Sequence, residues 1–224
     1  MGPLEPPRVG CTRTRQRATD DGASEMNGTD TDTTEAMGPM RGVKVVELGV
    51  WLAGPAAGGI LADWGADVVK VEPPSGDPCR LFQRMLGGDM PTNPIFEMDN
   101  RSKRGIAVDL STEEGLAIAM DLLAGADVFI TNLRIGALQR LGLDHPSIGE
   151  RFPRLVYCLI TGYGSAGPDA DRAAYDIAAF WARSGIAGLL TTPGGDPPFQ
   201  RGGMGDHSTG MAAAAAVSAA LFDR

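Results

Sequence analysis

The chain has 224 residues, of which 43% are hydrophobic, and its 20 basic and 28 acidic residues give a formal net charge of −8. This acidic balance argues against nucleic acid and against an anionic membrane surface as partners. The 3 cysteines and 2 histidines are too few and too scattered to indicate a disulfide framework or a metal site. Since no apolar run is long enough to span a bilayer and no signal peptide opens the chain, we expect a cytoplasmic protein.

Residues 1–40 are rich in Thr, Asp, Gly, Arg and Pro and have almost no apolar periodicity. Such a segment cannot bury enough apolar surface to offset the entropy of ordering it. We therefore expect residues 1–40 to form a disordered N-terminal tail. The remaining residues, 41–224, have the length of one α/β domain.

Residues 43–48 and 67–71 are apolar runs typical of buried strands, and the small apolar residues between them predict a helix over 55–64. Three more strands are predicted over residues 105–110, 127–131 and 154–161, and short helices over 81–86 and 135–141. The order of strand, helix and strand indicates a parallel sheet with crossover helices.

Three longer helices are expected further along the chain. Ser111 and Glu114 have the spacing of a capping box, in which the Ser111 side chain bonds the first N–H groups and Glu114 reaches back. Leu116, Met120 and Leu123 then fall on one face of the first of these helices. The other two are predicted over residues 172–185 and from about residue 208. A loop rich in glycine and proline separates them.

A glycine motif follows the last predicted strand. Residues 162–167 match the GxGxxG pattern of dinucleotide-binding sites. However, Pro168 stands where the phosphate-binding helix should already run, and the motif follows the fifth strand instead of the first. The motif is therefore a weak indication of a nicotinamide or flavin site.

Asp206 is a candidate for chemistry because glycines on either side of its segment allow a ligand or another backbone to approach closely. A helix start favours an ionised carboxylate, which a carboxylate nucleophile requires. The same position also suits an ordinary helix N-cap, so that reading stays open. His207, beside it, could act as a general base.

Other candidates lie at expected loop and helix ends. Tyr175 and Asp176 could place a second acid near the first, with helix capping again as the alternative. Residues 51–55 follow the first strand, at the carboxyl end where parallel sheets bind ligands. Lys103 and Arg104 suit either phosphate groups or a solvated charge pair.

Taken in chain order, several short segments resemble the family III CoA-transferases, the group of formyl-CoA transferase, carnitine CoA-transferase and 2-methylacyl-CoA racemase. They are residues 45–48, 53–55, 61–72, 100, 103–104, 108–110, 126–128, 132, 136, 138, 161–164, 175–176 and 205–206. The resemblance implies an α/β fold with a Rossmann-like parallel sheet and crossover helices. Family members are two-domain chains of roughly twice this length. On this basis residues 41–224 are an incomplete N-terminal α/β domain, and the second domain is absent.

The resemblance also implies an enzyme that moves CoA between an acyl-CoA and a carboxylic acid. Asp206 would be the nucleophile, passing through an aspartyl mixed anhydride and an aspartyl-CoA thioester. Tyr175 and Asp176 would join it as catalytic residues. Racemases of the family carry a His where this chain has Tyr175, and a phenol is a poor replacement near neutral pH, so transfer is favoured over racemisation.

Two alternatives stay open beside transfer. One is an acyl-CoA racemase-like enzyme. The other is a non-catalytic or split subunit that binds CoA and needs a complementary chain. The implied partners are accordingly an acyl-CoA and a small carboxylic acid, together with either a second copy in an interlocked homodimer or a complementary C-terminal half.

Coenzyme A, carried as the acyl-CoA substrate, is the cofactor that the resemblance implies, with no metal. Its adenine and pantetheine would lie in a channel lined by Trp51, Leu52 and Ala53. Further contacts implied by the family come from Asn132, Leu133, Ala137 and Arg140. Pro73 and Ala173 replace basic residues found in some transferases. We therefore expect the phosphates to be held by Lys103, Arg104 and Arg172.

Overall fold

The computed structural model describes residues 38–224, so the tail predicted for residues 1–40 lies outside the described residues except for its last three. Residues 38–40 form a turn in which the Met40 N–H donates to the Trp64 carbonyl at 2.8 Å. The Met40 side chain packs on the hydrophobic core. These three residues therefore belong to the folded part of the chain.

A five-stranded parallel sheet forms the centre of the fold, which confirms the predicted α/β class. Its order is β3-β2-β1-β4-β5. The chain moves outward in one direction from β1 to β3 and in the other from β4 to β5. In sheets of this kind, ligands bind where the order reverses, beyond the carboxyl ends of β1 and β4. The strands are β1 Lys44–Leu48, β2 Asp67–Glu72, β3 Arg104–Ala107, β4 Val128–Thr131 and β5 Val156–Leu159.

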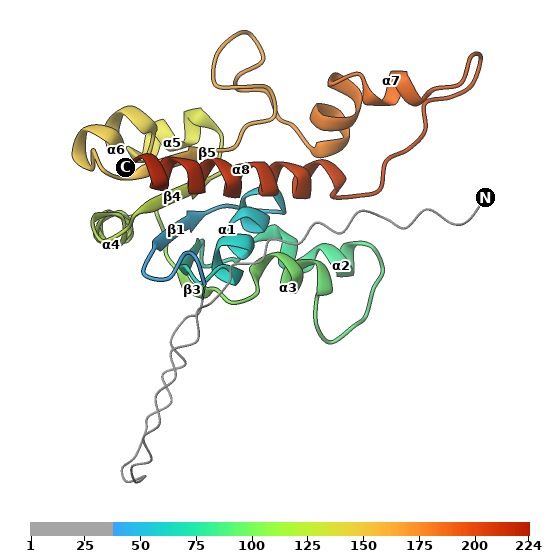
Figure 1. Ribbon diagram of the computed structural model, residues 1–224. Helices are drawn as coiled ribbons and strands as arrows, with labels where there is room; N and C mark the ends of the chain where they lie inside the picture. Colours follow the sequence, from blue (N-terminus) through green and yellow to red (C-terminus); the bar gives the residue numbers. More distant parts are fainter. Residues whose placement is uncertain (1–37) are drawn as a thin grey trace, which may run out of the picture. The chain divides into compact units, whose positions relative to one another are not determined.

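The helices connect and cover the strands (Figure 1). They are α1 Ala53–Asp63, the 3-10 helix η1 Pro78–Leu81, α2 Phe82–Met85, α3 Pro94–Asn100, α4 Glu113–Ala124, α5 Ile135–Leu141, α6 His145–Arg151, the π-helix η2 Ile177–Arg183, α7 Ile186–Leu190 and α8 Met204–Asp223. The short helices α3, α6 and α7 were not predicted. The helix expected over residues 172–185 is the shorter η2, and α8 begins four residues before the expected start.

Two hydrophobic clusters lie on opposite faces of the sheet. The alternation of strand side chains sends Val45 to one face and Val46 to the other. The Val45 face is covered by α1 and α8, and the Val46 face by α4, α5 and α6. Because helices cover both faces of the sheet, the strand sequences are nearly continuous apolar runs.

Helix α8 packs against α1 and runs antiparallel to the strands (Figure 1). Arg224, which follows the last residue of α8, donates to Asp127 at 2.6 Å, just before β4. Helix α8 therefore ends at the amino edge of the sheet and begins at the carboxyl edge. A Cβ on Gly210 would lie 2.7 Å from the Ala56 Cβ, so the close contact between the two helices requires glycine. No helix of residues 38–224 is long and apolar enough to cross a membrane.

The start of α4 corrects the predicted capping box. Thr112 is the N-cap residue, and its hydroxyl accepts from the Gly115 N–H at 3.0 Å. Ser111 instead donates its hydroxyl to Asp109 at 2.6 Å. Because the Ser111 hydroxyl is bonded to Asp109 in a local turn, Thr112 caps the helix instead.

Candidate active site

A cavity of about 340 Å³ lies where β4, β5, α1, η2 and α8 meet. The residues Asn132, Ile160 and Thr161 follow β4 and β5, so they place the cavity at the carboxyl edge of the sheet. All three predicted catalytic residues line it, together with small or apolar side chains. The lining includes Ala53, Asn132, Thr161, Tyr175, Asp176, Phe180, Asp206 and Thr209.

Asp206 occupies the first turn of α8, but it is not the N-cap. The N-cap is Gly203, whose backbone has φ +78°, a conformation that glycine adopts readily. No side chain caps this helix, and within residues 38–224 no hydrogen bond occupies the Asp206 carboxylate. The capping interpretation is therefore wrong, and the carboxylate is left available for chemistry.

The surroundings of Asp206 weaken its acidity. Burial raises the pKa of Asp206 to about 6, and the neighbouring Asp176 and Asp99 carboxylates act in the same direction, whereas His207 opposes them. The amino end of α8 also favours the ionised form, because the free N–H groups of the first turn carry positive charge. At neutral pH the group is therefore largely an anion in a half-buried position.

Asp176 is brought to the same cavity by the start of η2. Its Oδ1 accepts from the Ile177 N–H at 2.8 Å, so capping is part of its role. Its Oδ2 is buried and has no hydrogen-bond partner among the described residues. A Cβ on Gly205 would lie 2.8 Å from the Asp176 Cβ and 2.5 Å from the Phe180 Cβ. The glycine before Asp206 thus lets the two carboxylate-bearing segments approach each other.

The loop after β1 is held in a strained conformation. Trp51 has φ +63°, which is uncommon for a residue other than glycine. Asp77 accepts from the Trp51 N–H at 3.1 Å. Asn132 accepts from the Val50 N–H at 2.9 Å and donates to the Val50 carbonyl at 2.7 Å. The Trp51 ring meets the exposed Tyr175 ring edge to face at 6.1 Å. The loop is thereby fixed beside the cavity.

A second cavity, of about 300 Å³, adjoins the first one. The two share Asn132, Ile160, Thr161, Gly162, Ala174 and Tyr175. The second cavity is lined in addition by Trp51, Leu133, Arg134 and Arg172. The combined site therefore has an acidic end at Asp206 and Asp176 and a basic end at the two arginines.

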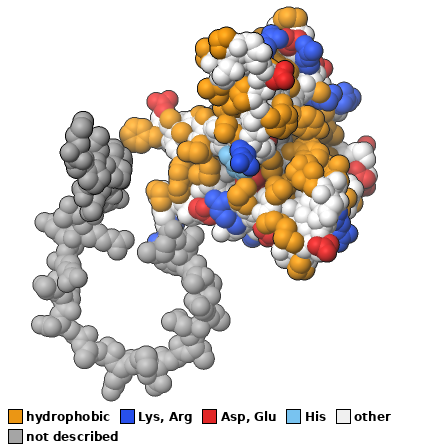
Figure 2. All heavy atoms as spheres, turned by 90° about the vertical axis from the view of Figure 1, so that its right-hand side faces the viewer, with side chains coloured by type: hydrophobic (Ala, Val, Ile, Leu, Met, Phe, Trp, Pro, Cys, Tyr) orange, Lys and Arg blue, Asp and Glu red, His pale blue; other side chains and the backbone are white. Residues whose placement is uncertain are grey.

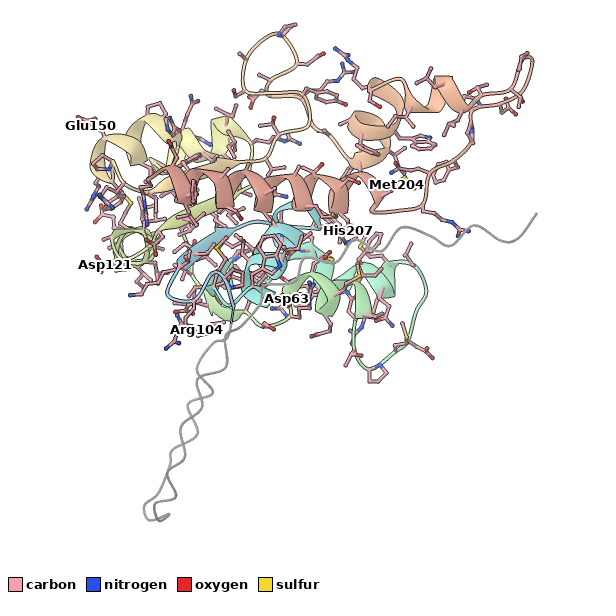
Figure 3. The ribbon with its side chains drawn as sticks, in the orientation of Figure 1. Asp63, Arg104, Asp121, Glu150, Met204 and His207 are labelled. Atoms are coloured by element: carbon pink, nitrogen blue, oxygen red, sulfur yellow. The ribbon has the colours of Figure 1, made fainter. Side chains whose placement is uncertain are left out.

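Two of the predicted phosphate-binding residues lie elsewhere. Arg104 is paired with Asp67 at 2.7 Å where β2 and β3 begin, at the amino edge of the sheet. Figure 3 shows it far from His207 and Met204. The Lys103 amine is buried, 2.6 Å from the Glu47 carboxylate and 2.8 Å from the Pro55 carbonyl. Neither side chain lines the two cavities, because each is held by an acidic partner.

The remaining predicted residues lie around the site at varying distance. Ala53 lines the first cavity, and Trp51, Asn132, Leu133 and Arg172 line the second. Leu52 lies beside Gly203 at the start of α8. Ala137 and Arg140 are on α5 and do not line either cavity.

Sequence reasoning missed the basic residue Arg134 and a group of buried charges. Arg134 comes two residues after Asn132, and a cation in the loop after a buried strand was the signal that could have indicated it. Glu47 and Lys70 lie within strands that are covered on both faces. A charged residue in such a strand needs an opposite charge, and that was the available signal.

These charges form a connected set, which we call the buried charge network: Glu47, Lys70, Asp77 and Lys103. The Lys70 amine lies 2.9 Å from Glu47 and 3.0 Å from Asp77. Although burial lowers it, the pKa of Lys70 is raised above its ordinary value because Glu47 and Asp77 favour the cation. Since Asp77 also holds the Trp51 N–H, the network supports the loop beside the second cavity.

The glycine motif of residues 162–167 does not form a dinucleotide site of the usual kind. No helix follows it directly, because the chain runs as loop and turn until η2 begins at Ile177. The pyrophosphate of a dinucleotide needs the amino end of a helix at this point. Gly162 instead lines both cavities.

Comparison with known proteins agrees with this geometry. The model of the family described as CoA-transferase family III matches residues 40–224. The cinnamoyl-CoA:phenyllactate CoA-transferase of Clostridium sporogenes is 43% identical over 183 residues, which cover 81% of this chain and 44% of that protein. The succinate–glutarate CoA-transferase of Agrobacterium fabrum is 40% identical, over 86% of this chain and 49% of that protein.

Solved structures show the same relationship. A CAIB/BAIF family protein from Brucella suis aligns with a TM-score of 0.76 and 40% identity, over 84% of this chain and 50% of that chain. The chain thus spans about half the length of the curated relatives that it matches. Since the family model covers nearly all of the described residues, the chain belongs to CoA-transferase family III.

Proposed function

We propose that this chain carries the nucleophile of an enzyme that moves CoA from an acyl-CoA to a carboxylic acid. The observation that carries the proposal is the Asp206 carboxylate, half-buried in the first turn of α8 and free of hydrogen bonds within residues 38–224. A structural aspartate at a helix start normally caps the helix. An anion held in a cavity without a partner is suited to attack an acyl group.

In the first half of the reaction, an Asp206 oxygen attacks the thioester carbonyl, the C–S bond breaks, and the CoA thiolate leaves. The product is a mixed anhydride between Asp206 and the acyl group. The thiolate then attacks the Asp206 carbonyl of the anhydride and displaces the donor carboxylate, which gives an aspartyl-CoA thioester. Each intermediate stays activated, so the exchange of one acid for another avoids hydrolysis.

In the second half, the acceptor carboxylate attacks the aspartyl thioester and the thiolate leaves again. The thiolate attacks the acceptor carbonyl of the new anhydride, forms the new acyl-CoA and restores the Asp206 carboxylate. Asp176 lines the same cavity with an unbonded oxygen. This oxygen can accept a hydrogen bond from a substrate.

The second cavity is the proposed place of the CoA moiety. Trp51 and Leu133 offer apolar surface, Asn132 lies where the two cavities join, and Arg172 is suited to a phosphate group. Arg134 takes the place that we expected for Lys103 and Arg104, since it lines this cavity. Guanidinium groups bind phosphates through paired hydrogen bonds.

We further propose that the active cytoplasmic protein contains more than these residues, either a second copy or a complementary half. Figure 2 shows the end of the domain at which α8 begins, where hydrophobic side chains cover much of the surface. Exposed hydrophobic side chains of this extent are typical of surfaces that another segment covers. The exposed large hydrophobic residues of the described chain include Met85, Leu86, Leu189 and Phe199.

The test uses the full chain with a panel of acyl-CoA thioesters, followed by hydroxylamine and peptide mass spectrometry. We expect a hydroxamate on Asp206 and none in the Asp206→Asn variant. Binding of CoA without any adduct, also after a complementary chain is added, would show a non-catalytic subunit. Exchange of the α-hydrogen for deuterium without a change of CoA partner would show a racemase and refute transfer.

A further inference from the structure

His207 is held at both of its ring nitrogens. Nδ1 lies 2.8 Å from the Gly203 carbonyl oxygen, and Nε2 lies 3.0 Å and 3.2 Å from the two oxygens of Asp99 on α3. Figure 3 shows His207 on α8, directly after the turn that contains Met204. A general base needs a nitrogen lone pair that faces its substrate. Because both nitrogens face protein acceptors instead, His207 does not fit the role of general base.

The two acceptors determine which protons the ring carries. A neutral imidazole has one N–H and would leave a lone pair facing the other acceptor, whereas an imidazolium donates from both nitrogens. The Asp99 side chain is only 2% exposed. An ionised carboxylate that is buried to this degree needs a positive partner. When Asp99 is ionised, the geometry at His207 is that of an imidazolium paired with a carboxylate.

Other charged groups around this pair are few and identifiable. Burial raises the pKa of Asp99, whereas His207 from α8, and Lys103 and Arg101 from the segment after α3, act to lower it. Asp206 is faced by Asp176 from the start of η2, by Asp99 from α3, and by its neighbour His207. Of the groups acting on Asp206, two are carboxylates that favour its protonated form, and His207 is the cation that opposes them.

We propose that His207 is a positioning residue: its imidazolium, anchored between Gly203 and Asp99, fixes the first turn of α8 and keeps the adjacent Asp206 carboxylate ionised. The anchor at Gly203 joins the ring to the residue that begins the helix. The consequence for turnover rests on the proposed function. The electrostatic effect on Asp206 does not, and it can be measured in the resting chain.

The test follows the Asp206 side-chain carboxyl by carbon-13 NMR during a pH titration of the full chain, with its signal assigned by Asp206→Asn. In His207→Gln the cation is lost and Asp99 stays, so the pKa of Asp206 should rise, by about one unit. In Asp99→Asn a carboxylate is lost, so the pKa of Asp206 should fall at pH values at which His207 still carries both of its protons. The double variant should return close to the wild-type value. Opposite shifts from the two partners are a result that a merely structural contact would not produce.

The other histidine provides the matched control. His145 begins α6 and meets the Tyr157 ring edge to face, so its substitution by Gln should leave the Asp206 titration unchanged. Shifts of the same sign in His207→Gln and Asp99→Asn, or no shift in either, would overturn the proposal. If His207→Gln fails to fold, Asp99→Asn alone tests the proposal, because a rise in the pKa of Asp206 in that variant would overturn it. A correct titration pattern without any acyl adduct on Asp206 would refute the proposed function and leave this inference standing.

Discussion

The carboxyl edge of the sheet holds two groups of charges, one buried and one half-buried, that also differ in how they are paired. In the buried charge network of Glu47, Lys70, Asp77 and Lys103, each carboxylate lies within 3.0 Å of a lysine amine. In the first cavity, the carboxylates of Asp206 and Asp176 are neighbours, and neither has a lysine or arginine partner within residues 38–224. Buried charges that are paired support a fold, whereas an unpaired buried carboxylate costs stability and is available for reaction.

The largest effect should come from the unpaired group. Asp206→Asn keeps the size of the side chain but removes the attacking anion, so acyl transfer should fall by at least about a thousandfold. The chain should stay folded, since no hydrogen bond among the described residues depends on this carboxylate. The measurement is CoA transfer in the assembled enzyme, with urea unfolding as the control. Transfer at the wild-type rate would remove Asp206 from the mechanism.

Substitutions in the buried charge network should change the stability of the fold. Lys70→Met leaves Glu47 and Asp77 buried without their shared cation, and we expect a loss of about 3–5 kcal/mol in the free energy of unfolding. Arg104→Met is the matched control, because it breaks an exposed pair with Asp67 and should cost less than about 1 kcal/mol. Urea denaturation measures both. Equal losses in the two variants would contradict the distinction between buried and exposed pairs.

The same difference explains what the sequence could reveal. Strand positions and the parallel sheet follow from local patterns, because apolar runs are local features. The local pattern at Asp206 suited a helix N-cap as well, and its role as nucleophile rested on the resemblance to the family. Lys103 was expected to bind a phosphate, but its amine is paired with Glu47. Glu47 lies in a strand much earlier in the chain, so the sequence around Lys103 gives no sign of this pair. Thr112 and Ser111 exchanged roles for a similar reason, since Asp109 competes for the serine hydroxyl.

A smaller effect is expected where the backbone brings the two carboxylates together. A methyl group at Gly205 would lie 2.5 Å from the Phe180 Cβ, so Gly205→Ala must push η2 and Asp176 away from α8. We expect a loss of about 1–3 kcal/mol in unfolding free energy and a lower yield of the Asp206 adduct. Gly202→Ala, whose added Cβ has open space, is the control. A Gly205→Ala chain that matches this control in both measurements would show that close approach is unnecessary.

The smallest effect concerns the pH dependence of stability. The pKa of Asp206 is raised by burial from 3.8 to about 6, so between these values the folded chain holds a proton that the unfolded chain has released. The contribution of Asp206 to stability therefore falls as the pH rises through this window. Asp206→Asn lacks the penalty, so it should be more stable than the wild type at pH 7.5, and the difference should vanish below about pH 4. Urea midpoints across this range measure it, with Ser208→Ala from the same turn as a variant that changes no charge and should show a constant difference. A stability gain for Asp206→Asn that persisted at low pH would come from packing. It would contradict the raised pKa of the unpaired Asp206 carboxylate.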